Sequence, residues 1–234
     1  MNIKALTFDT YGTVVDWRGS ILAELEAFGA AKQLTVDWEA FLADWKSCYR
    51  PGMEKVNNRE WPWTTVDEIY RWRLVELLNA YHITDVTEPQ SEQLNHVWRR
   101  LRPWPDSVPG LKRLRSKYII APLSNASFAA MVHLAKWSGL PWDCIMTAEN
   151  AKCYKPRPEV YQAAIRLLGL RPGEVMMVAA HNYDLRAAQA NGMRTAFIPR
   201  PTEYSPAQTT DLAPEGEWDL VAKDIEDLAQ ALGA

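Results

Sequence analysis

Residues 3–13 read IKALTFDTYGT, an apolar run that ends at Asp9 and passes directly into a turn. A short apolar run of this kind predicts a buried strand, with Asp9 at its C-terminal end. Parallel α/β sheets bind their ligands at that edge. The chain therefore opens on a candidate functional carboxylate.

A helical pattern follows this strand and continues to about residue 102. Apolar residues such as Ile21, Leu25 and Phe28 recur at helical spacing, and no strand pattern interrupts them. Seven of the 11 tryptophans lie between Trp38 and Trp104. We expect them to fill the core of a small helical subdomain; the alternative is that some wall an apolar pocket.

Strands and helices alternate after this block. This alternation predicts an α/β fold with a Rossmann-like parallel sheet as its core, formed by residues 1–14 and 103–234, and an inserted helical cap at 15–102. The predicted strands are 118–123, 144–147, 174–179 and 195–198, and the predicted helices are 108–116, 127–137, 158–168, 184–191 and 224–232.

Composition excludes several classes of protein. Hydrophobic residues make up 47%, charged residues 24%, and the net charge is −3, so no basic surface for nucleic acid is expected. The three cysteines have no CxxC spacing, which argues against a disulfide framework or a zinc site. No apolar stretch approaches the roughly 20 residues of a membrane span, and the N-terminus lacks a leader pattern. We therefore expect no membrane partner and a cytoplasmic location.

Four polar clusters follow predicted strands: residues 9–13, Ser124 with Asn125, Lys155, and residues 181–184. Because parallel strands end on the same side of a sheet, these clusters should meet there. A nucleophile, a cation and a second carboxylate would then lie together.

These motifs resemble those of the haloacid dehalogenase superfamily. FDTYGT is similar to its first motif, the Ser of PLSNAS to its second, the Lys of CYKPRPEVY to its third, and VAAHNYD stands in the place of its fourth. The resemblance covers almost the whole chain and implies a helical cap inserted just after the first motif.

The phosphatase branch of the superfamily is disfavoured by two positions. Its second acidic residue, a general acid and base, is replaced by Tyr11, and the leading Asp of its fourth motif is replaced by Ala180. The site thereby loses a ligand for Mg²⁺ and the acid for the leaving group. A Mg²⁺ phosphatase remains an alternative, as does a non-catalytic binding protein on the same scaffold, although intact charges at Asp9, Lys155 and Asp184 argue against the latter.

The motifs DxYGT, SNAS and YKP, with a Tyr six residues after the Lys, instead resemble the type II L-2-haloacid dehalogenases. That resemblance implies hydrolytic dehalogenation of small (S)-2-haloacids to (R)-2-hydroxyacids and halide, without metal or organic cofactor. It also implies a homodimer. A carboxylate can displace halide and form an ester with the substrate, and halide needs no general acid.

The resemblance also assigns catalytic roles. Asp9 is the nucleophile, Thr13 orients it, and Lys155 holds it ionised. Asp184 positions Lys155 or the hydrolytic water.

Other positions correspond to the substrate pocket. Ser124 and the amides after Asp9 would bind the substrate carboxylate beside Tyr11, Asn125 would face the halide, and Tyr161 would complete the polar wall. Asn125 and Ser127 have the alternative role of helix N-cap residues, and Tyr161 that of a core residue.

The chain departs from the dehalogenase pattern at two places. Ala179 and His181 replace a Ser and an Asn, so His181 is a candidate base for the hydrolytic water or a neutral histidine bonded in its loop. Where the family's cap presents an Arg to the halide, this chain offers Lys46 or Arg50, and both candidates remain open.

Overall fold

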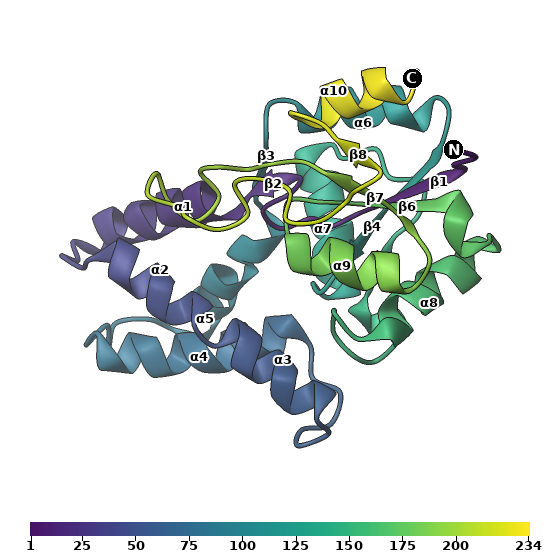
Figure 1. Cartoon of the computed structure of the whole chain (residues 1–234). Helices are drawn as coiled ribbons and strands as arrows, with labels where there is room; N and C mark the ends of the chain where they lie inside the picture. The colour runs from purple at the N-terminus through teal and green to yellow at the C-terminus, as the bar shows by residue number, and fades with distance from the viewer.

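The computed structural model describes residues 1–234 and contains a six-stranded parallel sheet with strand order β5-β4-β1-β6-β7-β8 (Figure 1). Its strands are β1 (Ala5–Phe8), β4 (Ile119–Ser124), β5 (Met146–Thr147), β6 (Val175–Ala179), β7 (Arg194–Phe197) and β8 (Leu220–Val221). The order runs one way from β1 through β4 to β5 and the other way from β6 to β8. The point where the direction changes lies between β1 and β6, which is the usual ligand position in such sheets.

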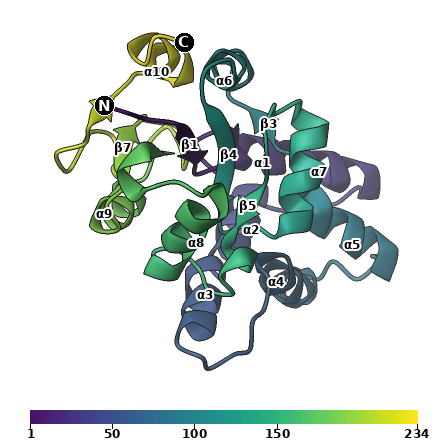
Figure 2. The same cartoon turned by 90° about the vertical axis from the view of Figure 1, so that its right-hand side faces the viewer.

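Helices cover both faces of the sheet (Figures 1 and 2). One face packs against α6 (Ser107–Arg115), α7 (Phe128–Ser138) and α10 (Ile225–Ala231), and the other against α8 (Pro158–Leu168) and α9 (Asn182–Ala190). Three short 3-10 helices complete the chain: η1 (His96–Arg99), η2 (Ala148–Asn150) and η3 (Pro172–Glu174).

The central strand β1 is buried on both faces, as its apolar sequence predicts. Leu6 and Phe8 belong to the core under α6, α7 and α10, while Ala5 belongs to the core under α8 and α9. The side chains alternate between the faces because the strand period is two. Asp9 follows immediately at the carboxyl edge.

The chain between β1 and β4 contains the helical block expected from the sequence. It comprises α1 (Trp17–Lys32), α2 (Trp38–Lys46), α3 (Tyr49–Asn57), α4 (Val66–Ala80) and α5 (Glu88–Asn95). Its apolar residues form one continuous core with the sheet face that α6 and α7 cover. The block is therefore packed onto the sheet.

The tryptophans serve mainly as core residues of this block. Trp45 is fully buried and donates from Nε1 to the carbonyl of Tyr70 at 2.8 Å. Trp98 stacks on the Tyr70 ring with a centroid separation of 4.0 Å. Trp17, which precedes the stretch from Trp38 to Trp104, instead lines a cavity described below.

Four short strands differ from the sequence prediction. A two-stranded antiparallel pair, β2 (Val15–Asp16) with β3 (Arg102–Pro103), joins the two ends of the helical block, where the pattern predicted no strand. β8 is also additional, and β5 is shorter than the predicted 144–147. Strands of two residues are too short to produce a period-two pattern.

The segment between β7 and β8 crosses the carboxyl edge of the sheet and reaches toward α1 (Figure 1). It is held at Asn182, whose backbone amide and side-chain amide both donate to the Asp211 carboxylate. The side-chain oxygen of Asn182 accepts from the Trp218 indole at 3.0 Å. We name residues 198–219 the C-terminal loop. No helix of the structure is long and apolar enough to cross a membrane.

Candidate active site

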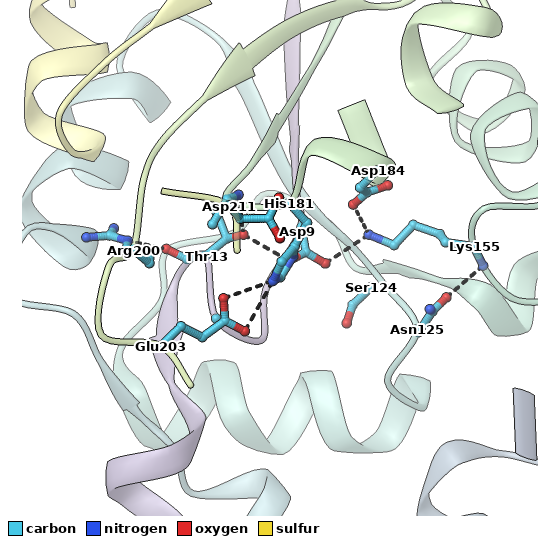
Figure 3. Close-up of polar contacts among 12 residues, drawn as sticks. Asp9, Thr13, Ser124, Asn125, Lys155, His181, Asp184, Arg200, Glu203 and Asp211 are labelled. Atoms are coloured by element: carbon cyan, nitrogen blue, oxygen red, sulfur yellow. Dashed lines mark hydrogen bonds and ion pairs between the residues drawn. The ribbon is translucent and has the colours of Figure 1, made fainter. Parts of the chain in front are cut away.

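Polar side chains from distant parts of the chain meet where the strand order changes direction (Figure 3). Asp9 follows β1, His181 and Asp184 follow β6, Lys155 precedes α8, and Glu203 comes from the C-terminal loop. The structure thus brings the four polar clusters of the sequence together and adds a residue from a fifth segment.

Asp9 is held by three donors. Lys155 Nζ lies 2.9 Å from Oδ1, whereas Oδ2 accepts from the Thr13 hydroxyl at 2.9 Å and lies 3.1 Å from His181 Nδ1. The Thr13 oxygen itself accepts from the amide of Ala180 at 2.9 Å, so its single hydrogen is directed at Asp9.

The protonation state of Asp9 follows from these neighbours. Burial alone would raise the pKa of the carboxyl group, but the charges of Lys155 and His181 outweigh it and hold the pKa below its ordinary value. The carboxylate is therefore ionised in the resting protein.

Lys155 also pairs with a second buried carboxylate. Its ammonium lies 2.5 Å from Asp184 Oδ2, and Tyr161 donates to Asp184 Oδ1 at 2.5 Å. Both oxygens of Asp184 are thus occupied, and its side chain has no exposed surface. The sequence left open whether Tyr161 is core or site; it is a fully buried residue whose hydroxyl fixes Asp184.

His181 lies between two carboxylates. Its Nδ1 faces Asp9, and its Nε2 lies 2.9 Å from Glu203 Oε2. Glu203 is oriented in turn by the Trp17 indole, which donates to Oε1 at 3.0 Å. Burial alone would lower the pKa of His181, but Glu203 and Asp9 hold the pKa well above its usual value. The imidazole is therefore protonated, with both N–H groups donating.

Gly12 in the first motif leaves room for the carboxylate of Glu203. A Cβ at this position would lie 2.1 Å from Glu203 Oε1, and the backbone has φ +92°, a conformation that suits glycine. The first motif and the C-terminal loop are therefore fitted to each other.

Arg200 fastens the same two segments together. It forms a bidentate pair with Asp106, at 2.8 and 2.7 Å, and donates from Nε to the carbonyl of Thr13 at 2.9 Å. Because Arg200 precedes Glu203 by three residues, this buried pair fixes the start of the loop that carries Glu203.

A cavity of about 550 Å³ opens beside Asp9. The core contributes Ser124 and His181, the helical block contributes Lys46 and Tyr49, and the C-terminal loop contributes Glu203. Small-molecule sites have volumes in this range and a few convergent polar groups.

Lys46 projects into this cavity within a ring of aromatic side chains. Its ammonium lies 3.7 Å from the Tyr49 ring centroid and 5.1 Å from that of Trp17, and it donates to the Tyr70 hydroxyl at 3.1 Å. No carboxylate lies within 4.0 Å of it, and burial lowers the pKa of Lys46 to about 8. An unpaired cation facing a cavity favours an anionic ligand.

Arg50 lines the same cavity but is exposed, with its guanidinium 5.8 Å from the Tyr183 ring centroid. Of the two cations that the sequence offered, Lys46 therefore lies deeper and Arg50 at the margin.

The remaining predicted substrate residues lie in different environments. Ser124 and Tyr11 line the cavity, and Tyr11 donates to the Trp98 carbonyl at 2.9 Å. Asn125 does not line it, because its side chain accepts from the Lys155 amide at 2.8 Å and donates to Tyr49 at 3.4 Å. It is not the helix cap either, since Ser127 caps α7.

The geometry does not suit a Mg²⁺ ion. The two carboxylates that could share a cation, Asp9 and Asp184, are already bridged by the ammonium of Lys155. No group of three or more His, Cys, Asp or Glu side chains has an arrangement that could hold a metal ion. The Tyr11 and Ala180 side chains supply no anionic ligand.

Comparison with known proteins agrees with this geometry. Residues 3–192 match the family model of haloacid dehalogenase-like hydrolases. The chain belongs to this family. It is 30% identical to (S)-2-haloacid dehalogenase 4A of Burkholderia cepacia over 96% of this chain and 97% of that protein.

Solved structures of the haloacid dehalogenase-like family are also similar. An L-2-haloacid dehalogenase is 42% identical, with a TM-score of 0.96 and 99% of both chains covered. A defluorinating L-2-haloacid dehalogenase is 44% identical, with a TM-score of 0.96 and coverage of 99% of this chain and 96% of that one. The superfamily resemblance drawn from the sequence motifs is confirmed.

The sequence motifs of the family did not reveal Glu203, Trp17 or Arg200. Glu203 lies in a Pro-rich loop without periodicity, and it contacts His181 across 22 residues of sequence. The one feature of the sequence that relates to Glu203 is Gly12, and a glycine does not show which residue packs against it.

Proposed function

We propose that this chain is a hydrolase of carbon–halogen bonds that converts small (S)-2-haloacids into (R)-2-hydroxyacids and halide. One observation carries the proposal: Asp9 is ionised, faces a cavity and lacks the second carboxyl group of the phosphatase motif, since Tyr11 occupies that position. Such a site can perform nucleophilic displacement without protonating the leaving group. The names of the similar proteins, (S)-2-haloacid and L-2-haloacid dehalogenases, support the same substrate class.

In the first half-reaction, Asp9 attacks the α carbon, halide departs, and an ester forms on the enzyme. Lys155 and Thr13 orient the carboxylate for this attack. The helical block, residues 15–102, serves as the cap that presents Lys46 to the substrate. Binding in a cavity walled by the core and the cap holds the reacting atoms together.

Substrate recognition uses anion-binding groups on opposite walls. Ser124 and the backbone amides of Thr10 and Tyr11 bind the carboxylate; neither amide donates to another backbone or side-chain acceptor in the structure. Lys46 and, at the margin, Arg50 attract the anionic substrate and the halogen as it becomes halide.

In the second half-reaction, water attacks the ester carbonyl with His181 as its base. His181 is favoured over Asp184 because it lines the cavity, whereas both oxygens of Asp184 are occupied by Lys155 and Tyr161. Glu203 orients His181 through Nε2 and directs Nδ1 to the reaction centre.

The direct test is halide release from chloro, bromo and fluoro 2-haloacids in the presence of a chelator. We expect halide and (R)-hydroxyacid from (S) substrates. The fluoro acids belong in the panel because one similar structure is that of a defluorinating enzyme. Absence of halide with every acid, together with hydrolysis of phosphate esters, would instead favour the phosphatase.

Metal removal is a separate prediction. Dialysis against EDTA should change halide release by less than about twofold, because Lys155 already neutralises the carboxylates that a cation would bind. Loss of activity that Mg²⁺ restores would contradict this expectation.

The pH dependence of substrate binding should follow the titration of the Lys46 ammonium group. Its pKa of about 8 means that the ammonium is charged below that pH and loses its charge as the pH rises through it. The KM for substrate should therefore increase several-fold between about pH 7 and about pH 9.5. Lys46→Met should give weaker, pH-independent binding, and Lys46→Arg should remove the alkaline increase. A wild-type KM that stays constant over this range would refute the assignment.

A further inference from the structure

Both ring nitrogens of His181 are protonated, whereas a general base needs one unprotonated nitrogen. Asp9 Oδ2 lies 3.1 Å from Nδ1, and Glu203 Oε2 lies 2.9 Å from Nε2, so each ring nitrogen donates to a carboxylate. A doubly protonated imidazole cannot accept a proton from water. Its role in the second half-reaction therefore requires that a proton leave first.

The charges around His181 indicate when this occurs. Asp9 and Glu203 are the two carboxylates in direct contact with the ring, and Figure 3 shows them on different sides of it. Lys155 and Asp184 lie beyond Asp9 and pair with each other. The remaining ionisable residues that line the cavity are Tyr11, Lys46, Tyr49, Arg50, Tyr183, Arg186, Tyr204, Asp211 and Glu215. Of these groups, only Asp9 changes its charge in the first half-reaction.

We propose that alkylation of Asp9 expels the Nδ1 proton of His181, so that the enzyme makes its own base as it forms the ester. This inference rests on the proposed function, in which Asp9 is the nucleophile. An ester has no charge, so one of the two anions that retain the proton disappears, and the uncharged carbonyl oxygen is a weaker acceptor. Glu203 remains at Nε2 and retains the other proton, which leaves Nδ1 as the free nitrogen facing the ester.

The two half-reactions balance in this scheme. In the first, a carbon–halogen bond breaks, a carbon–oxygen bond to Asp9 forms, halide leaves, and the proton of His181 passes to solvent. In the second, the oxygen of water bonds to the Asp9 carbonyl carbon, and the bond from that carbon to the substrate oxygen breaks. One water proton goes to the departing hydroxyacid and the other restores His181. The single proton of the overall reaction is thus released with halide, before hydrolysis.

Glu203 is a positioning residue in this scheme. By retaining the proton on Nε2 it ensures that the imidazole loses the proton that faces Asp9. Trp17 donates to the carboxylate of Glu203, and Gly12, which has no side chain, leaves room for that carboxylate.

The test compares two variants that should accumulate the ester. Glu203→Gln keeps the His181 imidazole but removes the carboxylate that orients it. His181→Gln removes the titrating group while retaining a polar side chain of similar size. Both should hydrolyse the ester about a hundredfold more slowly than the wild type, as expected for loss of general-base catalysis. Each enzyme is mixed in excess with (S)-2-chloropropionate, and three signals are followed: halide, protons by a pH indicator in weak buffer, and the mass of the protein.

The two variants should differ in the timing of proton release. Glu203→Gln should release about one proton per ester together with halide, whereas His181→Gln should release halide and form the ester without a proton, which appears later with the hydroxyacid. The proposal is overturned if both variants release the proton with the hydroxyacid, or if neither accumulates an ester. Failure of the proposed function is a distinct result, because the wild type would then release no halide and no ester mass would appear in any variant.

Discussion

Asp9→Asn is expected to reduce halide release by at least about a thousandfold. The amide is a poor nucleophile, and neither neighbouring carboxylate can replace Asp9, because Asp184 is enclosed by Lys155 and Tyr161. Glu203 is bound by His181 and Trp17. Steady-state halide release measures the loss. Calorimetric binding of the hydroxyacid product serves as the control, since the cavity should remain intact.

Isotope labelling identifies the reacting atom independently of mutation. In a single turnover in ¹⁸O water with enzyme in excess, the hydroxyacid should be mostly unlabelled and the peptide containing Asp9 should gain the label. The reason is that water attacks the carbonyl carbon of the ester and leaves its oxygen in the protein. Labelled product in the first turnover would mean that water activated by His181 or Asp184 attacks the substrate carbon directly, and Asp9 would then be an orienting group.

Lys155→Ala has the second largest expected effect, a decrease in turnover of at least about a hundredfold. The substitution removes the cation that Asp9 and Asp184 share, so two buried carboxylates lose their common partner. Lys152→Ala provides a matched control, because it removes the same charge three residues away, where the side chain is exposed over Trp63. A loss below about tenfold for Lys155→Ala would contradict its role.

The pH profile of Lys155→Ala adds a second readout. In the wild type the lowered pKa of Asp9 keeps the nucleophile ionised, and activity is lost only as the pH falls through that low value. Without Lys155, burial raises the pKa of Asp9 with less opposition, so the acid limb should move to higher pH. A purely structural role for Lys155 would lower activity without moving this limb.

The sequence predicted those parts of the site that follow strands. Asp9, Ser124 and Asp184 follow apolar runs at the ends of strands. Because a parallel sheet places such positions at one edge, their proximity can be predicted without knowing how the side chains pack. Lys155 was placed by its motif and lies where it was expected, against Asp9. The protonation of His181 was not predictable, because it depends on Glu203, which approaches from an irregular loop.

Residues on the helical block also show which features a sequence pattern predicts and which depend on packing. Helical spacing predicted that Lys46 and Arg50 lie on one side of their segment, but which of them points inward depends on the aromatic rings of Trp17, Tyr49 and Tyr70. These rings come from three different helices. Packing between elements, which single-sequence patterns do not encode, thus decides which of the two cations lies deeper in the cavity.

The family match ends at residue 192, and Glu203 lies beyond it. The nucleophile and its lysine therefore come from the part of the chain that matches the family model, while the partner of the base comes from the C-terminal loop. Gly12 and Arg200 fit this loop to the first motif, so the two segments are not independent. Substitutions in the loop that keep Arg200 in place would alter how fast the ester is cleared with the least disturbance to the step that expels halide.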